Sequence, residues 1–79
     1  QREIALSALY ALGRMGDDRA LESIIKIYDE NNDPVIREKI VYTLSNFKNE
    51  KALDKIIDIA RNDPNPRLRE KAIYWLSEQ

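Results

Sequence analysis

Apolar residues recur three or four positions apart along most of this chain, which is the spacing of one face of an α-helix. In the middle of the chain they fall at Ile36, Ile40, Leu44 and Phe47, and Val41 widens this face. The strict alternation of apolar and polar residues that indicates a half-buried β-strand is absent. The pattern therefore predicts an all-α protein of five antiparallel helices, at about 2–14, 18–30, 35–47, 50–62 and 67–77.

Three further segments show apolar faces with the same helical spacing. We expect these faces to meet in one core, with Ile59 at the edge of the fourth helix. The expected members are Ala5, Ala8, Leu9, Leu12 and Met15 in the first helix, Ala20, Leu21, Ile24, Ile25 and Tyr28 in the second, and Ala52, Leu53, Ile56, Ile57 and Ala60 in the fourth.

Residues that favour helix ends stand at the predicted boundaries. Asp33 and Asn65 each precede a proline, so each can cap a helix whose first position tolerates the missing N–H of proline. Asp17 and Asn49 are the expected caps of the second and fourth helices. Pro64 and its polar neighbours are expected to end the fourth helix.

The sequence repeats itself, without a gap, when it is shifted by 32 residues. Tyr10 aligns with Tyr42 and Tyr74, and the run 37–39 (Arg-Glu-Lys) recurs intact at 69–71. One helical hairpin cannot cover its own apolar face, so successive hairpins are expected to stack around a shared core. We expect a single domain over 1–79, with repeats at about 2–32 and 33–64 and a half repeat at 65–79.

The last predicted helix, 67–77, has no partner helix after it in the sequence. Its outward side is therefore expected to be partly uncovered, and it can associate with another copy of the chain or with further units. Because the chain begins at Gln1 rather than at methionine, we favour a longer parent protein that continues past Gln79. Trp75 either fills the core of this last unit or lies at the uncovered edge.

Composition narrows the chemistry that the chain can perform. The 79 residues include 13 Lys+Arg and 14 Asp+Glu, so the net charge of −1 excludes a strongly basic nucleic-acid binder. The absence of Cys and His excludes disulfides, thiol and imidazole catalysis, and nearly every zinc or haem site. The lack of Cys fits a reducing compartment. With no signal peptide and no apolar run of about 20 residues, we expect a cytoplasmic location and no membrane contact.

The repeated segments resemble HEAT repeats, most closely those of the phycobilisome-lyase type. The segments that carry the resemblance are 12–17 (Leu-Gly-Arg-Met-Gly-Asp) with 19–21, 33–34 with 36–39, and 65–66 with 68–71. The resemblance covers essentially the whole chain and implies a right-handed α–α superhelix, a HEAT-like solenoid. The chain departs from the family pattern at Ser45 and Lys48, where glycine is usual, so the turn there is expected to differ.

The resemblance also implies a structural role for Arg37 and Arg69. In the family an arginine at this position pairs with acidic groups and carbonyls of the adjoining unit. Asp33 or Asp63 could be the acidic partner in this chain.

Candidate catalytic groups are few. Glu22 and Lys26 lie four residues apart, as do Asp54 and Asp58, with Lys55 beside the second pair. We interpret these residues as solvated helix faces with local ion pairs rather than as a general acid or a metal site. We expect no catalytic residue, no metal and no cofactor. Some HEAT-like proteins are iron hydroxylases that use His-Glu pairs, and a chain without His cannot supply these.

A continuous basic stripe, which binding to nucleic-acid phosphates would need, is also absent. Lys26, Lys55 and Arg61 on the second helices alternate with acidic residues. Nucleic acid is therefore not the expected partner, and a DNA-binding module is the weakest of the alternatives.

The remaining function is a non-catalytic scaffold for protein–protein interaction, in which a polypeptide binds the concave face formed by the second helices. The polar positions expected on that face are Glu22, Ser23, Lys26, Glu30, Asp54, Lys55, Asp58 and Asn62. Tyr10, Tyr42 and Tyr74 form a convex ladder that either contacts a partner or only covers neighbouring aliphatic stems. The alternative function is a HEAT-like module of a lyase or of a protein-modifying enzyme.

Overall fold

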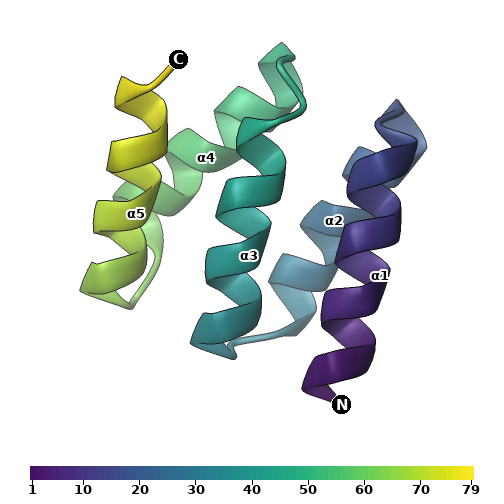
Figure 1. The fold of residues 1–79 in the computed structure, drawn as a ribbon. Coiled ribbons are helices and arrows are strands. Elements are labelled where there is room, and N and C mark those ends of the chain that lie inside the picture. Colours follow the sequence, from purple (N-terminus) through teal and green to yellow (C-terminus); the bar gives the residue numbers. More distant parts are fainter.

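The computed structural model describes residues 1–79 and contains five α-helices and no strand. Helices α1, α3 and α5 lie side by side in one layer, and α2 and α4 form a second layer behind them (Figure 1). The predicted all-α class is confirmed. The helices are α1 (Arg2–Met15), α2 (Asp18–Glu30), α3 (Pro34–Ser45), α4 (Glu50–Asn62) and α5 (Pro66–Ser77).

Short loops with defined caps connect the layers. The side chains of Asp17 and Asn49 accept hydrogen bonds from the backbone N–H groups three residues later, at 2.8 Å in both cases. Asp33 and Asn65 accept from the N–H groups two residues later, at 2.9 Å, and a proline follows each of them at the first helical position. All four caps predicted from the sequence are therefore confirmed. The predicted repeat boundaries fall in these loops and stay a prediction.

Helix α3 is shorter than predicted. Its last residue is Ser45, and Phe47 lies in a turn in which its N–H bonds to the carbonyl of Leu44. Lys48 then adopts a φ of 56°, close to the 66° of Gly16, which holds the same repeat position. Lys48 thus keeps the left-handed backbone conformation that Gly16 adopts at the same repeat position. Residues with a side chain disfavour this conformation, so the departure from glycine here has an energetic cost.

The core lies between the two layers. Its fully buried members include Leu9, Leu21, Ile24, Ile40, Leu44, Ile56 and Ile59. Two details of the predicted core are wrong. Ile59 is fully buried rather than at the edge, because α4 packs against both α3 and α5 and so buries a wider arc. Met15 is exposed, because it stands in the last turn of α1, the outermost helix of its layer.

No helix is both long and apolar enough to cross a lipid bilayer.

The ends of the helical layer differ from its middle. Ile4 of α1 is exposed, although Ile36 and Leu68, at the same position of the next two repeats, are buried. The repeat pattern thus determines which residues are apolar, and the neighbouring helices determine which of them are covered.

Candidate functional site

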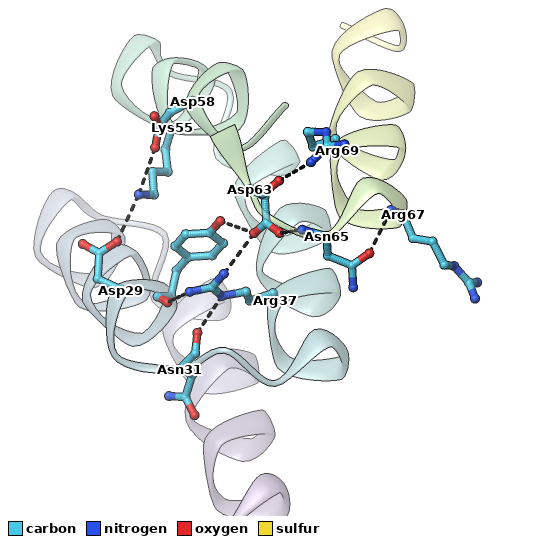
Figure 2. Close-up of polar contacts among 10 residues, drawn as sticks. Asp29, Asn31, Arg37, Lys55, Asp58, Asp63, Asn65, Arg67 and Arg69 are labelled. Carbon is cyan, nitrogen blue, oxygen red and sulfur yellow. Dashed lines mark hydrogen bonds and ion pairs between the residues drawn. The ribbon is translucent and has the colours of Figure 1, made fainter. Parts of the chain in front are cut away.

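A buried polar cluster connects the ends of α2 and α4 to α3 (Figure 2). The guanidinium of Arg37 donates from Nε to the carbonyl of Asn31 at 2.6 Å and from Nη2 to the carbonyl of Tyr28 at 3.2 Å. Its Nη1 lies 3.1 Å from Oδ2 of Asp63, whose side chain is only 1% exposed. The carbonyls implied for Arg37 by the family resemblance are confirmed, since Tyr28 and Asn31 belong to the adjoining first repeat. The acidic partner is Asp63, which belongs to the same repeat as Arg37.

Tyr28 completes this cluster. Its hydroxyl donates a hydrogen bond to Asp63, and its ring lies between the guanidinium of Arg37, 4.1 Å from the centroid, and the ammonium of Lys55, at 4.6 Å. Burial raises the pKa of the Tyr28 phenol, and the hydrogen bond to Asp63 raises it further. No buried side-chain polar atom is left without a partner. The cluster therefore has no free group for a ligand, and its role is to join the units.

Asp33 takes a different partner. It pairs with Arg2 at 2.8 Å on the surface, where this hydrogen bond holds the pKa of the carboxyl below its usual value. Arg69 donates to the carbonyl of Asp63 at 2.6 Å and forms no ion pair. The two equivalent arginines, Arg37 and Arg69, thus occupy unlike environments.

The eight polar residues predicted on the second helices all lie on α2 and α4, and only Lys55 among them is not exposed. The ammonium of Lys55 lies 3.2 Å from Asp29 and 3.4 Å from Asp58, and its side chain is 14% exposed. Glu22 pairs with Lys51 at 3.2 Å rather than with Lys26. A local ion pair within one helix therefore forms between Lys55 and Asp58, as expected. Glu22 forms none within its own helix, because its ion pair with Lys51 joins α2 to α4.

The environment of Asp58 favours the ionised form of its carboxyl. Nδ2 of Asn62 donates to it at 2.8 Å, and this hydrogen bond is the largest cause that lowers the pKa of the carboxyl, followed by Lys55. A carboxyl held in its ionised form is a poor general acid. Of the predicted residues on α2 and α4, four make no hydrogen bond or ion pair through their side chains: Ser23, Lys26, Glu30 and Asp54.

A groove with aromatic lining lies on the other layer, between α3 and α5. The ring of Trp75 contacts Tyr42 and Tyr74 edge to face, with centroids 5.4 Å and 5.0 Å apart. Val35 and Ile73 add exposed apolar surface to the same groove. We call this set of side chains the α3–α5 groove.

Tyr10, the first rung of the predicted ladder, is separate from the α3–α5 groove and lies beside Arg14 on α1. Tyr10, Tyr42 and Tyr74 are all exposed, and their contact with a partner stays a prediction.

Comparison with protein families matches residues 1–77 to the family described as HEAT repeats. The chain belongs to the HEAT repeat family. No curated protein and no solved structure matches it. The HEAT repeat match does not extend to the narrower phycobilisome-lyase type.

As a HEAT repeat protein, the chain has a fold that is commonly used as a scaffold for protein interaction and is typically non-enzymatic. No group of three or more acidic side chains gathers where a metal ion could be held. This HEAT repeat structure presents two candidate surfaces, the α3–α5 groove and the polar face of α2 and α4.

Analysis of the sequence misses one member of the buried cluster and two residues of the groove. The helical spacing places Tyr28 in the core for its ring, but its hydroxyl also has a buried acceptor. The sequence does not single out Val35 and Ile73 as groove residues, because their exposure depends on how α3 and α5 pack. A signal for Tyr28 was present, since a tyrosine on a buried face normally needs a hydrogen-bond partner.

Proposed function

We propose that this HEAT repeat chain is a non-catalytic scaffold that binds a polypeptide segment in the α3–α5 groove. The observation that carries the proposal is the aromatic cluster in the α3–α5 groove, in which Tyr42 and Tyr74 are exposed and Trp75 is half-buried. Aromatic side chains are enriched at protein interfaces because they offer large apolar area together with a polar tip.

The arrangement of the rings supports this role. Trp75 contacts an aromatic ring on either side, so its side chain is already held before a partner arrives. An ordered side chain loses little conformational entropy on binding, and this preserves more of the interaction free energy. Rigid aromatic anchors of this kind are the usual sites of strong contribution to binding.

The charges around the groove favour a polypeptide over an anionic ligand. Lys71 on α5 pairs with Glu38 on α3 at 3.3 Å, and Lys39 and Glu70 also line the groove. Both signs are thus present in equal number, whereas phosphate recognition needs a concentration of positive charge. A peptide backbone with mixed side chains suits such a rim.

The polar face of α2 and α4 is a second candidate for the partner site. The ion pairs of Lys51 with Glu22 and of Lys55 with Asp29 connect the two helices, while Ser23, Lys26, Glu30 and Asp54 stay free. Side chains that have no partner, on a surface held by ion pairs between helices, favour polar contacts with a polypeptide. This face lacks an apolar anchor, so we rank it below the groove.

Other hypotheses assign the chain different roles. A HEAT-like module of the phycobilisome-lyase type, or of another lyase or protein-modifying enzyme, would bind a chromophore tightly or support turnover when isolated. A DNA-binding module would show binding that weakens steeply with salt. Neither has an observed site, since no metal cluster or uniformly basic face is present.

The test is selection of binders to the purified chain from a displayed library of random linear peptides. We expect selected peptides to change the fluorescence of Trp75, which is the one tryptophan of the chain. Tyr42→Ala should weaken their binding roughly thirtyfold, the effect of losing a strong aromatic anchor. The matched control is Lys26→Glu on α2, which should leave the binding of these peptides unchanged.

The opposite result would transfer the site to the other face. If Lys26→Glu and Asp54→Lys abolish binding while Tyr42→Ala does not, the α2–α4 face is the partner site and the groove proposal is wrong. Circular dichroism of each variant confirms that the helices are intact, so that a loss of binding reports the surface and not the fold.

A further inference from the structure

A smaller hollow lies next to the α3–α5 groove, between α1 and α3, which are neighbours in one layer (Figure 1). Its volume is about 280 Å³, which suits a single side chain rather than a drug-sized ligand. Buried Leu9 and Thr43 and half-buried Leu6 belong to its lining. We call this hollow the α1–α3 pocket. Its exposed lining residues form the rim: Tyr10, Arg14, Lys39, Tyr42 and Asn46.

The α1–α3 pocket has small residues where the next repeat has larger ones. On α5, Trp75 contacts the ring of Tyr42. The residue at the same repeat position on α3 is Thr43, whose Cγ2 would lie 3.2 Å from a Cβ placed on Gly13. The equivalent of Gly13 on α3 is Ser45. The repeat thus places no large ring between α1 and α3, where an indole lies between α3 and α5.

The rim of the α1–α3 pocket carries positive charge only. Arg14 on α1 and Lys39 on α3 both line the pocket, and no acidic residue does. Neither of these cations forms an ion pair. In the α3–α5 groove, by contrast, Glu38 and Glu70 stand beside the lysines. The α1–α3 pocket is therefore the one of these two adjacent hollows whose charge suits an anion.

The tyrosines of the rim position both cations without neutralising them. The guanidinium of Arg14 lies 5.8 Å from the ring centroid of Tyr10, and its Nη1 donates to the Tyr10 hydroxyl at 3.5 Å. The ammonium of Lys39 lies 5.6 Å from the ring centroid of Tyr42. Both distances fall within the range of cation–π attraction. The side-chain amide of Asn46 adds a further N–H donor to the rim.

We propose that the α1–α3 pocket binds the side chain of a phosphotyrosine in a polypeptide partner. A phosphate monoester carries about two negative charges at neutral pH, which match the charges of Arg14 and Lys39. A guanidinium can also donate two parallel hydrogen bonds to phosphate oxygens. The phenyl ring of the ligand packs against Tyr42 and the apolar lining of the pocket.

Other anionic side chains fit the α1–α3 pocket less well. An aspartate or glutamate carries one negative charge, so one of the two cations would stay unmatched. A phosphoserine supplies the charge but has no ring to cover Leu6 and Leu9. The pocket shares Lys39 and Tyr42 with the α3–α5 groove, so one polypeptide can occupy both, but phosphotyrosine binding does not depend on the groove.

The probe is N-acetyl-phosphotyrosine amide, titrated into the full isotope-labelled chain and followed by the backbone amide shifts in NMR spectra. We expect saturable shifts at Gly13, Arg14 and Thr43. Arg14→Gln should weaken binding about tenfold, the effect of losing a hydrogen bond between charged groups. The matched control is Lys26→Gln, which removes an exposed cation of α2 that has no ion pair and should leave binding unchanged.

Three outcomes would overturn the proposal. The first is the absence of saturable shifts while the spectrum shows a folded chain. The second is equal binding of N-acetyl-tyrosine amide, because the pocket would then recognise the ring alone. The third is equal binding of inorganic phosphate or of N-acetyl-aspartate amide, because the rim would then hold any anion.

The same variant separates this pocket from the α3–α5 groove. Arg14 lines the α1–α3 pocket but not the groove. Arg14→Gln should therefore leave the binding of unphosphorylated groove peptides unchanged. Loss of phosphotyrosine binding with retained peptide binding, or the reverse, shows which of the two proposals fails.

Discussion

Helix α3 packs against two second-layer helices, α2 and α4, whereas α5 packs against α4 alone. We call the packing around α3 the closed junction and the packing around α5 the open junction. Both helices carry the same Arg-Glu-Lys run at the same repeat position. Arg37 nevertheless has two carbonyls and a buried carboxylate, and Arg69 has one carbonyl. The comparison shows that a repeated motif sets which groups are offered and that the following helix sets which of them are satisfied.

The same contrast holds for the apolar residues. Leu44 is buried, and Leu76 at the equivalent position is half-buried. Burial of apolar surface contributes about 25 cal/mol per Å². Identical side chains should therefore contribute unequally to the free energy of unfolding, in proportion to the cover that each receives.

The largest expected effect is a difference between two equivalent truncations. Leu44→Ala should lower the free energy of unfolding by about 3 kcal/mol, because it removes buried methyl groups and leaves a cavity. Leu76→Ala should cost only about 1 kcal/mol, because solvent already reaches the side chain. Urea denaturation followed by circular dichroism measures both. Equal costs would show that α5 is covered in solution, for example by self-association, and the dependence on protein concentration would reveal this.

A smaller effect is expected from the polar part of the closed junction. Asp63→Asn removes the charge opposite Arg37 and weakens the acceptor of Tyr28, so it should destabilise the chain by about 2 kcal/mol. The control is Asp29→Asn, whose side chain is 60% exposed beside Lys55 and which should cost less than about 1 kcal/mol. The same urea measurement applies, and a cost no greater than that of the control would contradict the role assigned to the cluster.

The local structure was predictable because it depends on nearby residues. The caps Asp33 and Asn65 and the helical spacing of apolar residues act within a few positions, so the helices were found almost to the residue. The ladder Tyr10–Tyr42–Tyr74 was also visible, but the clustering of two rungs on Trp75 was not. That clustering depends on how two helices distant in sequence pack together.

The polar candidates were harder to predict for the same reason. Lys55 reads as a surface lysine, yet its contacts with Asp29 and the ring of Tyr28 come from the other helix of the layer. The family resemblance offered Asp33 or Asp63 as the acidic partner of Arg37, and the structure selects Asp63, 26 residues away along the chain. Interactions between residues distant in sequence thus required either a family pattern or the structure.

The smallest expected effect is a pH dependence confined to the closed junction. Burial and the contact with Asp63 raise the pKa of Tyr28, so the folded chain keeps the phenol proton after the unfolded chain has lost it, above about pH 10. The stabilisation is complete below that pH. It declines as the pH rises, by at most about 1.4 kcal/mol per pH unit. Tyr28→Phe should lose this part of the decline in urea denaturation measured from pH 9 upward, whereas Tyr10→Phe, which removes an exposed phenol, should retain it. Parallel declines in the two variants would contradict a buried, neutral Tyr28. Ala60 stands at the repeat position of Tyr28 in the second hairpin, so the open junction lacks the phenol that gives Tyr28 its part in this slope.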